Sequence, residues 1–81
     1  MDHDAEYVKP LPDFKLHVAL SDGRQGVFDL KPHLQMVAMA ALREVAYFNQ
    51  AQILFGAVTW PGGEDIAPDT LAAELQALAS V

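Results

Sequence analysis

The sequence contains no cysteine, and this absence excludes several kinds of chemistry. Without thiols the chain cannot form disulfides, bind zinc through thiolates or use a cysteine nucleophile. It also lacks any apolar run near the roughly 20 residues that a helix needs to cross a bilayer. Its first residues, Met1–Glu6, are acidic where a signal peptide is basic and then apolar. We therefore expect a cytoplasmic protein that does not span a membrane.

Basic residues are scarce as well. Five lysines and arginines stand against eleven acids, and the net charge is −6. Binding to nucleic acid requires several basic side chains on one face. Here they are spread singly along the chain, as Lys9, Lys15, Arg24, Lys31 and Arg43. This distribution disfavours direct nucleic-acid binding, and the acidic surface favours a basic protein partner.

The length of 81 residues predicts a single domain, residues 1–81, near the lower limit of what folds alone. Hydrophobic residues make up 52% of the chain. A core of this size supplies only about 3–5 kcal/mol, and small domains often gain further stability from a partner. We therefore expect a homodimer.

The clearest local pattern is a hairpin. Residues 14–20 alternate between apolar and polar side chains, a period of two that predicts a half-buried strand. Asp22 and Gly23 then predict a two-residue turn with positive φ at both positions. That register turns Phe28 away from the apolar row, whereas a one-residue bulge brings Phe28 onto the same face as Leu16. Because Phe28 is a large apolar group, we expect the bulge.

Two other regions predict strands. Residues 5–11 predict a short strand, and Pro10 and Pro12 suit the edge of a sheet because proline has no N–H to donate. Residues 52–60 are rich in β-branched and aromatic types, and they predict two short strands that meet at Gly56-Ala57.

Two regions have helical patterns. Residues 31–49 place apolar side chains at helical spacing and contain neither glycine nor proline after Pro32, which predicts one helix. A last helix is predicted to open at Pro68 and to pack on the sheet through leucines. These leucines are Leu71, Leu75 and Leu78. The opposite face is small enough for a close helix contact and consists of Ala72, Ala73, Gln76 and Ala77.

The segment after Trp60 joins the last of these strands to the last helix. Pro61 ends the strand, and Gly62-Gly63 permits a tight reversal. Glu64 and Asp65 are adjacent, but neighbouring side chains diverge in a turn, so a shared acid–base site is not supported. We interpret Asp65 as a cap for backbone N–H groups before the helix. We interpret Trp60 as a core residue, with a binding platform as the alternative.

No pattern in the chain indicates catalysis. His3, His17 and His33 lack the spacing of metal ligands. There is no glycine-rich phosphate loop, and no serine has a base placed by a motif. Asp22 and Asp29 are interpreted as turn residues that accept hydrogen bonds from the backbone. We expect no catalytic residue, no metal and no cofactor.

Three motifs stand out together: Phe-x-Leu-x-Val-x-Leu-Ser-Asp-Gly at 14–23, Phe-Asp-Leu-Lys-Pro at 28–32, and Trp-Pro-x-Gly-x-Asp-Ile-Ala-Pro-Asp-Thr-Leu at 60–71. In order and spacing the chain resembles the bacterial domain of unknown function 2442 (DUF2442) over about residues 5–71. The positions that carry the resemblance are Asp22, Gly23, Asp29, Trp60, Pro61, Gly63, Asp65 and Pro68.

The resemblance implies an α+β fold with a small, mostly antiparallel sheet, short intervening helices and one C-terminal helix. It replaces the single helix over residues 31–49 by two short helices at 32–37 and 44–49. It implies no catalytic residues. As partner it implies a small protein encoded nearby, in an arrangement resembling a toxin–antitoxin pair.

We therefore expect a non-enzymatic protein-interaction module, as the acidic partner in a toxin–antitoxin-like gene pair. The alternative is a small-ligand-binding protein or an enzyme with a site near Trp60 and Asp65. A DNA-binding regulator is a third hypothesis, which the scattered basic residues disfavour.

Overall fold

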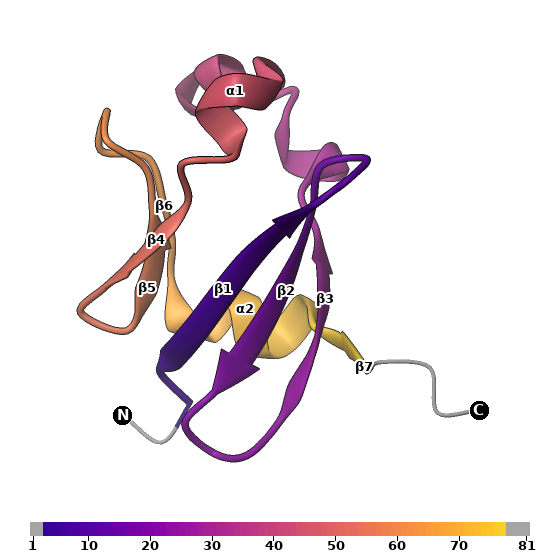
Figure 1. Ribbon diagram of the computed structural model, residues 1–81, viewed down its shortest axis with the longest axis vertical. Coiled ribbons are helices and arrows are strands. Elements are labelled where there is room, and N and C mark those ends of the chain that lie inside the picture. The colour runs from indigo at the N-terminus through magenta and orange to yellow at the C-terminus, as the bar shows by residue number, and fades with distance from the viewer. Residues whose placement is uncertain (1–2, 78–81) are drawn as a thin grey trace.

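The structure, a computed structural model, describes residues 3–77 and contains two antiparallel sheets (Figure 1). The first sheet has the order β1-β2-β3-β7, with strands Ala5–Leu11, Lys15–Leu20, Gln25–Asp29 and Gln76–Ala77. The second has the order β4-β5-β6, with strands Gln52–Leu54, Ala57–Thr59 and Asp65–Ile66. The helices are η1 (Lys31–His33), η2 (Val37–Arg43), α1 (Val45–Phe48) and α2 (Pro68–Glu74). The expected small α+β fold is confirmed.

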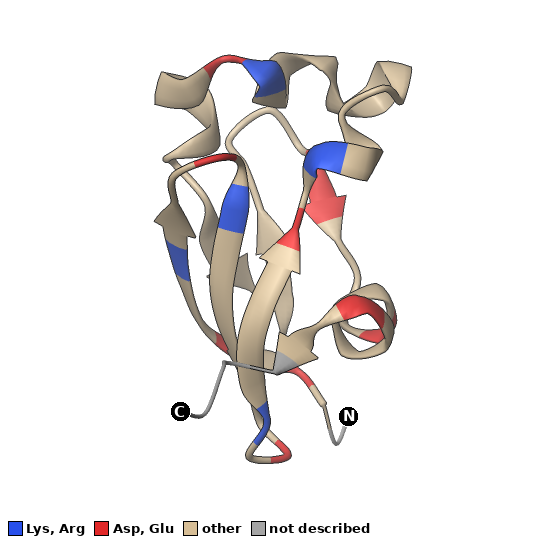
Figure 2. Ribbon diagram, turned by 90° about the vertical axis from the view of Figure 1, so that its right-hand side faces the viewer, with Lys and Arg blue, Asp and Glu red and all other residues tan. Residues whose placement is uncertain are grey.

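The helices enclose the core from two sides. α2 covers one face of the four-stranded sheet, and the helical segment (residues 31–48) crosses one end of both sheets (Figures 1 and 2). Both sheets, the helical segment and α2 all contribute buried side chains. The largest of these are Trp60, Phe28, Phe48, Leu16, Leu30, Leu42, Leu71, Val18 and Val58. One core therefore holds all four parts together.

The strand predictions near the N-terminus are confirmed. β1 has the expected bounds and lies at the edge of its sheet, where Pro10 needs no ladder partner for an N–H. β2 buries every second side chain, namely Leu16, Val18 and Leu20. The period of two in the sequence therefore reports a sheet with one covered face.

The β2–β3 hairpin confirms the face of Phe28 and corrects the turn. Leu16 pairs with Phe28, and both are fully buried. The Gly23 N–H donates to the Leu20 carbonyl at 3.1 Å, and Gly23 has φ 93° whereas Asp22 does not have positive φ. The predicted two-residue turn is therefore wrong. The loop has three residues and ends on a left-handed glycine, which supplies the expected extra residue.

The loop after Trp60 repeats this arrangement in the second sheet. The Gly63 N–H donates to the Trp60 carbonyl at 3.0 Å, and the Trp60 N–H donates to the Glu64 carbonyl at 3.0 Å. Gly63 has φ 100°, so it holds the same place as Gly23 in the first hairpin. Both motif glycines are required by backbone geometry.

The β4–β5 hairpin confirms the two short strands predicted in residues 52–60, but their junction lies at Phe55-Gly56, one residue before the predicted Gly56-Ala57. Leu54 pairs with Ala57, so Phe55 and Gly56 form a two-residue turn. Both turn residues have positive φ, 50° and 78° respectively, which is the geometry of a type I′ turn. The Ala5 N–H donates to the Gly56 carbonyl at 2.8 Å, which ties this hairpin to β1.

The helical segment differs from both expectations. It contains three short helices, and η2 occupies the stretch where the resemblance implies a break. The apolar stripe expected from helical spacing, which comprises Leu34, Val37, Ala41 and Val45, is wrong as well. Val37 is 92% exposed and Val45 is 55% exposed. Leu42 and Phe48 are buried instead. Tertiary packing in the core, and not helical periodicity, determines which side chains of this segment are buried.

The C-terminal helix begins as predicted and ends earlier. Pro68 is its first residue, but the chain becomes extended at Leu75 (ψ 124°), and Gln76 pairs with Val27 of β3. Leu78 lies outside the described residues. Because Gln76 and Ala77 belong to a strand, the expected small helical face is not formed. That face supported the expected homodimer, which stays a prediction.

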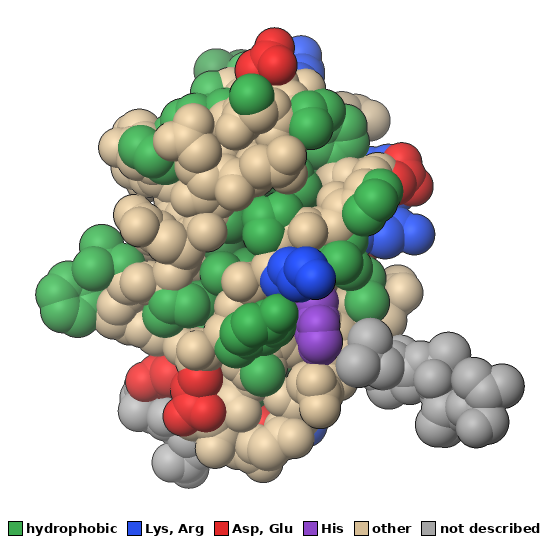
Figure 3. All heavy atoms as spheres, in the orientation of Figure 1, with side chains coloured by type: hydrophobic (Ala, Val, Ile, Leu, Met, Phe, Trp, Pro, Cys, Tyr) green, Lys and Arg blue, Asp and Glu red, His purple; other side chains and the backbone are tan. Residues whose placement is uncertain are grey.

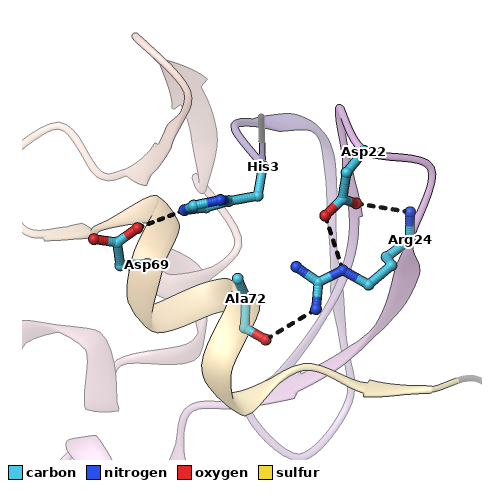
Figure 4. Close-up of polar contacts among 5 residues, drawn as sticks. All are labelled: His3, Asp22, Arg24, Asp69 and Ala72. Atoms are coloured by element: carbon cyan, nitrogen blue, oxygen red, sulfur yellow. Dashed lines mark hydrogen bonds and ion pairs between the residues drawn. The ribbon is translucent and has the colours of Figure 1, made fainter. Parts of the chain in front are cut away.

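Polar contacts attach α2 to the first hairpin and to the start of the chain (Figure 4). Asp22 holds the Arg24 side chain through an Nε–Oδ2 contact of 2.9 Å, and Arg24 Nη1 donates to the Ala72 carbonyl at 3.4 Å. His3 Nε2 contacts the Asp69 carboxylate near the beginning of the helix. The motif residue Asp22 therefore helps to place α2.

Candidate functional site

A cleft of about 440 Å³ lies between the helical segment and the β6–α2 region. Its lining residues are His33, Met36, Met39, Asp65, Ile66, Ala67, Thr70 and Glu74. Small-ligand sites commonly enclose roughly 300–1,000 Å³. Two parts of the chain that are distant in sequence, residues 33–39 and 65–74, therefore form a space large enough to receive a ligand or a side chain.

One wall of the cleft comes from β6 and α2. Ile66 is 5% exposed and fixes β6 to the core, so the alternation of the strand turns Asp65 outward. Pro68 starts α2 immediately afterwards. Thr70 and Glu74 are four residues apart in that helix, so they share one face, and both line the cleft.

The opposite wall contains a fixed histidine. The His33 ring stacks on Phe28 with a centroid distance of 5.4 Å and an interplanar angle of 24°. Its Nε2 lies 2.8 Å from Glu74 Oε1. Because Phe28 is fully buried, these contacts hold His33 and Glu74 in place across the cleft.

Asp65 lines the cleft, and its predicted capping role is wrong. The N-cap of α2 is Ala67, which makes no side-chain cap hydrogen bond. Asp65 is exposed, and its carboxylate makes no hydrogen bond with any other residue in the described range 3–77. The carboxylate is therefore available to a group that enters the cleft.

The neighbouring acid, Glu64, instead closes the loop after Trp60. Tyr47 Oη donates to Glu64 Oε1 at 2.6 Å, and it accepts the Gly62 N–H at 2.5 Å. The hydrogen bond to the Glu64 carboxylate raises the pKa of Tyr47, because it favours the protonated phenol. The two adjacent acids therefore have different roles: Glu64 accepts the Tyr47 hydroxyl, and Asp65 lines the cleft.

We predict that alkaline titration of tyrosine absorbance resolves one tyrosine with a pKa above the usual value of about 10. Replacing Tyr47 by phenylalanine removes that component, whereas Tyr7→Phe retains it. Because the pKa of Tyr47 is higher in the folded chain than in the unfolded chain, the contact stabilises the fold below about pH 10, and its contribution is lost as the pH rises further. A Tyr47→Phe titration curve that retained the high-pKa component would contradict the Tyr47–Glu64 contact.

Trp60 belongs to the core, which confirms its preferred interpretation as a core residue. Its side chain is 2% exposed, and Nε1 donates to the Phe48 carbonyl at 2.9 Å. The indole stacks on Phe48 at a centroid distance of 6.3 Å. Trp60, Glu64 and Asp65 therefore do not form a common site, and only Asp65 reaches the cleft.

The interpretation of Asp22 and Asp29 as turn residues is confirmed. Asp22 accepts the Arg24 N–H and Asp29 accepts the Lys31 N–H, each at 3.0 Å. The Arg24 N–H lowers the pKa of Asp22 most. For Asp29 burial works to raise the pKa, but the Lys31 N–H and ammonium outweigh it and hold the pKa below its usual range. Both carboxylates therefore serve the backbone.

A further hollow of about 390 Å³ lies beside the β1–β2 turn. Its lining is mainly apolar and comprises Pro10, Leu11, Pro12, Asp13, Phe14, Val45, Phe48 and Asn49. Asp13 and Phe14 have positive φ, 67° and 57°. Lys31 Nζ donates to the Asp13 carbonyl at 3.1 Å and to its Oδ2 at 2.9 Å, which restrains this left-handed turn.

The histidines lie apart in the structure. His17 Nε2 lies 3.0 Å from Gln25 Oε1, whereas His3 and His33 contact different carboxylates of α2. Residues 3–77 contain no group of three or more histidine or acidic side chains that could hold a metal ion.

Sequence reasoning did not identify Met36, Met39 or Glu74 as neighbours of Asp65. No local signal could have done so, because their proximity depends on how the helical segment packs against α2.

Phe55 was also missed, although a signal exists for it. Two predicted strands that meet at a glycine imply a two-residue turn, and the residue before Gly56 then lies at its exposed centre.

These features define a small α+β domain with a mixed polar and apolar cleft. Over residues 5–77 the sequence matches the family model described as "Protein of unknown function (DUF2442)", and the chain belongs to this family. The comparisons with curated proteins and with solved structures give no match. Among residues 3–77, no helix is long and apolar enough to cross a membrane.

Proposed function

We propose that this chain is a non-enzymatic protein-interaction module that contacts its partner through the tip of the β4–β5 hairpin. The observation that carries the proposal is that Phe55 is exposed and has a left-handed backbone conformation. Its side chain is 94% exposed, and its backbone has φ 50°.

This combination is costly for the fold. The left-handed conformation costs a residue with a Cβ about 1–2 kcal/mol, and glycine or asparagine is preferred at this position of a type I′ turn. An aromatic side chain that is almost fully exposed gains no burial energy to offset that cost. A backbone cost that no burial offsets suggests that the Phe55 side chain contacts another molecule.

Other apolar side chains are exposed beside Phe55 and on the helical segment. Leu54, beside Phe55, is 51% exposed. Figure 3 shows hydrophobic side chains that protrude at the hairpin tip and gather over the helical segment. Met36, Val37 and Val45 of that segment are all more than half exposed. Exposed apolar groups of this kind favour a partner protein.

The proposed partner is a basic protein, since the chain carries a net charge of −6. The resemblance implies a small protein encoded nearby, and such a protein is our candidate, in the arrangement of a toxin–antitoxin-like pair. The absence of cysteine suits an interaction in the cytoplasm.

We predict that Phe55→Asn weakens the complex at least about tenfold, since truncating an interface anchor commonly costs 2 kcal/mol or more. The measurement is co-expression of the chain with the protein encoded by the adjacent gene, followed by titration of the purified pair. Phe55→Tyr is the matched control: it keeps a ring at the tip and should retain the complex. A wild-type chain that elutes alone, or a Phe55→Asn complex of unchanged affinity, would overturn the proposal.

The cleft favours a second candidate function, the binding of a small ligand beside Asp65. In this alternative only Asp65 lines the cleft, because Trp60 is buried and does not reach it. Binding of free arginine amide, compared with binding of a peptide that contains arginine, separates a small-cation site from a site for a protein side chain.

A further inference from the structure

We infer that the cleft between the helical segment and α2 receives the side chain of an arginine from a basic protein segment. The inference rests on the proposed function, because it names the chemistry by which an interaction partner would be recognised. The cleft combines the two surfaces that an arginine side chain needs, an apolar wall and carboxylates.

The apolar wall suits the aliphatic stem. Met36 and Met39 contribute flexible thioether side chains, and Ile66 contributes a nearly buried aliphatic group. Methionine adapts its shape to the group it contacts, and an arginine stem loses little hydration when it packs on such a surface.

The polar part of the lining suits the guanidinium. The Asp65 carboxylate makes no hydrogen bond with another described residue, and Glu74 uses Oε1 for His33. The Thr70 hydroxyl lies on the same helix face as Glu74. A guanidinium presents five N–H donors in a planar fork and can engage several oxygen acceptors at once, which the single ammonium of lysine does less well.

The chain's own cations near the cleft are engaged elsewhere. Lys31 lies close in sequence, but its Nζ contacts Asp13 and Asp29 at 2.9 and 3.2 Å. The Arg43 Nε donates to the Leu34 carbonyl at 2.8 Å. No lysine or arginine of residues 3–77 lines the cleft. The carboxylates of the cleft therefore meet no lysine or arginine of that range, and the only ring nitrogen in contact with them is His33 Nε2 beside Glu74.

The surroundings favour a side chain on a protein over a free cation. Met36 lines the cleft and is 51% exposed, and the adjacent Val37 is 92% exposed. A free cation would leave this apolar rim in water. A peptide that places an arginine in the cleft can cover the rim with the residues on either side.

The test uses a blocked pentapeptide, acetyl-Ala-Leu-Arg-Leu-Ala-amide, added to the full chain with labelled methionine methyl groups. The methyl signals of Met36 and Met39 should shift on titration. The same peptide with citrulline, which keeps the shape and lacks the charge, should bind at least about tenfold more weakly, since a hydrogen bond to a charged group contributes about 1.5–3 kcal/mol.

Two double variants with the same net charge separate a local effect from a general one. Asp65→Asn/Glu74→Gln and Glu6→Gln/Glu44→Gln each change the net charge from −6 to −4, since two carboxylates are removed (−6 + 2 = −4). Glu6 and Glu44 are exposed and do not line the cleft. The first variant should lose about tenfold in affinity for the peptide, and the second should bind like the wild-type chain. Unfolding midpoints confirm that each variant is folded.

Several results would overturn the inference. Equal binding of the arginine and citrulline peptides would show that charge is not recognised. An equal loss in both double variants would show that only net charge matters. Free arginine amide that bound as tightly as the peptide would make the cleft a small-cation site. Phe55→Asn should leave peptide binding unchanged, so the failure of this inference and the failure of the proposed hairpin contact give different results.

Discussion

Replacing Trp60 by alanine should leave most of the chain unfolded at room temperature. Trp60 is 2% exposed and packs against Phe48, to whose carbonyl it also donates a hydrogen bond of 2.9 Å. Loss of a buried tryptophan costs about 3–5 kcal/mol. A core of this size contributes about the same amount in total.

Circular dichroism and urea unfolding measure this effect. Phe55→Ala is the matched control, because it removes an aromatic side chain that is 94% exposed and should change the unfolding free energy little. Trp60→Phe gives a graded result, since an aromatic ring remains and the Phe48 carbonyl loses the indole donor but keeps the Ala51 N–H at 3.3 Å, so the lost hydrogen bond costs about 0.5–1.5 kcal/mol. A Trp60→Ala chain that unfolds cooperatively with nearly wild-type stability would mean that this packing is not what holds the sheets together.

Replacing Gly26 by alanine should detach β7 from the sheet. A Cβ at Gly26 would lie 2.1 Å from the Gln76 carbonyl oxygen and 2.8 Å from the carbonyl carbon. Both atoms belong to the backbone, so the clash cannot be relieved by a side-chain rotation. Overpacking of this kind costs roughly 1–3 kcal/mol, a large share of the stability of a small domain.

A shortened chain that ends at Leu75 isolates the cause. Removing β7 removes both backbone atoms of Gln76 and leaves the Leu75 side chain at 3.2 Å, so Gly26→Ala should cost less in that background. Urea unfolding of the four chains gives the coupling between Gly26 and β7, which should be of the order of 1 kcal/mol or more. A similar cost of Gly26→Ala in the full and shortened chains would contradict the close approach of the two strands.

The parts of the fold that follow from local chemistry were predictable. Alternation identifies β2, the prolines identify β1 as an edge, and Pro68 identifies the first residue of α2. The face of Phe28 also followed, because a large apolar side chain forces the register of a hairpin with one covered face.

The errors occur where tertiary contacts override periodicity. Leucines at 71, 75 and 78 resemble a helical stripe, but the open edge of β3 offers backbone hydrogen bonds to Gln76 and Ala77, and the chain takes those instead. In the helical segment, burial of Leu42 and Phe48 determines the path, and their spacing matches no single helix.

The cleft shows which candidate functional residues could not be predicted from the sequence. Asp65 was identified by motif, but its role as a cap failed because β6 turns it outward and the helix begins after Ala67. Its neighbours His33, Met36 and Glu74 come from other parts of the chain. No spacing in the sequence records that these residues meet.

The most direct test of the proposed function measures two properties of one variant, Phe55→Asn. If Phe55 serves a partner at the expense of the fold, this substitution should raise the unfolding free energy by about 0.5–1 kcal/mol, because asparagine suits the left-handed position before Gly56. The same protein should bind the product of the adjacent gene at least about tenfold more weakly. Unchanged affinity would contradict the proposal, and stability equal to or below that of the wild-type chain would contradict the backbone cost assigned to Phe55.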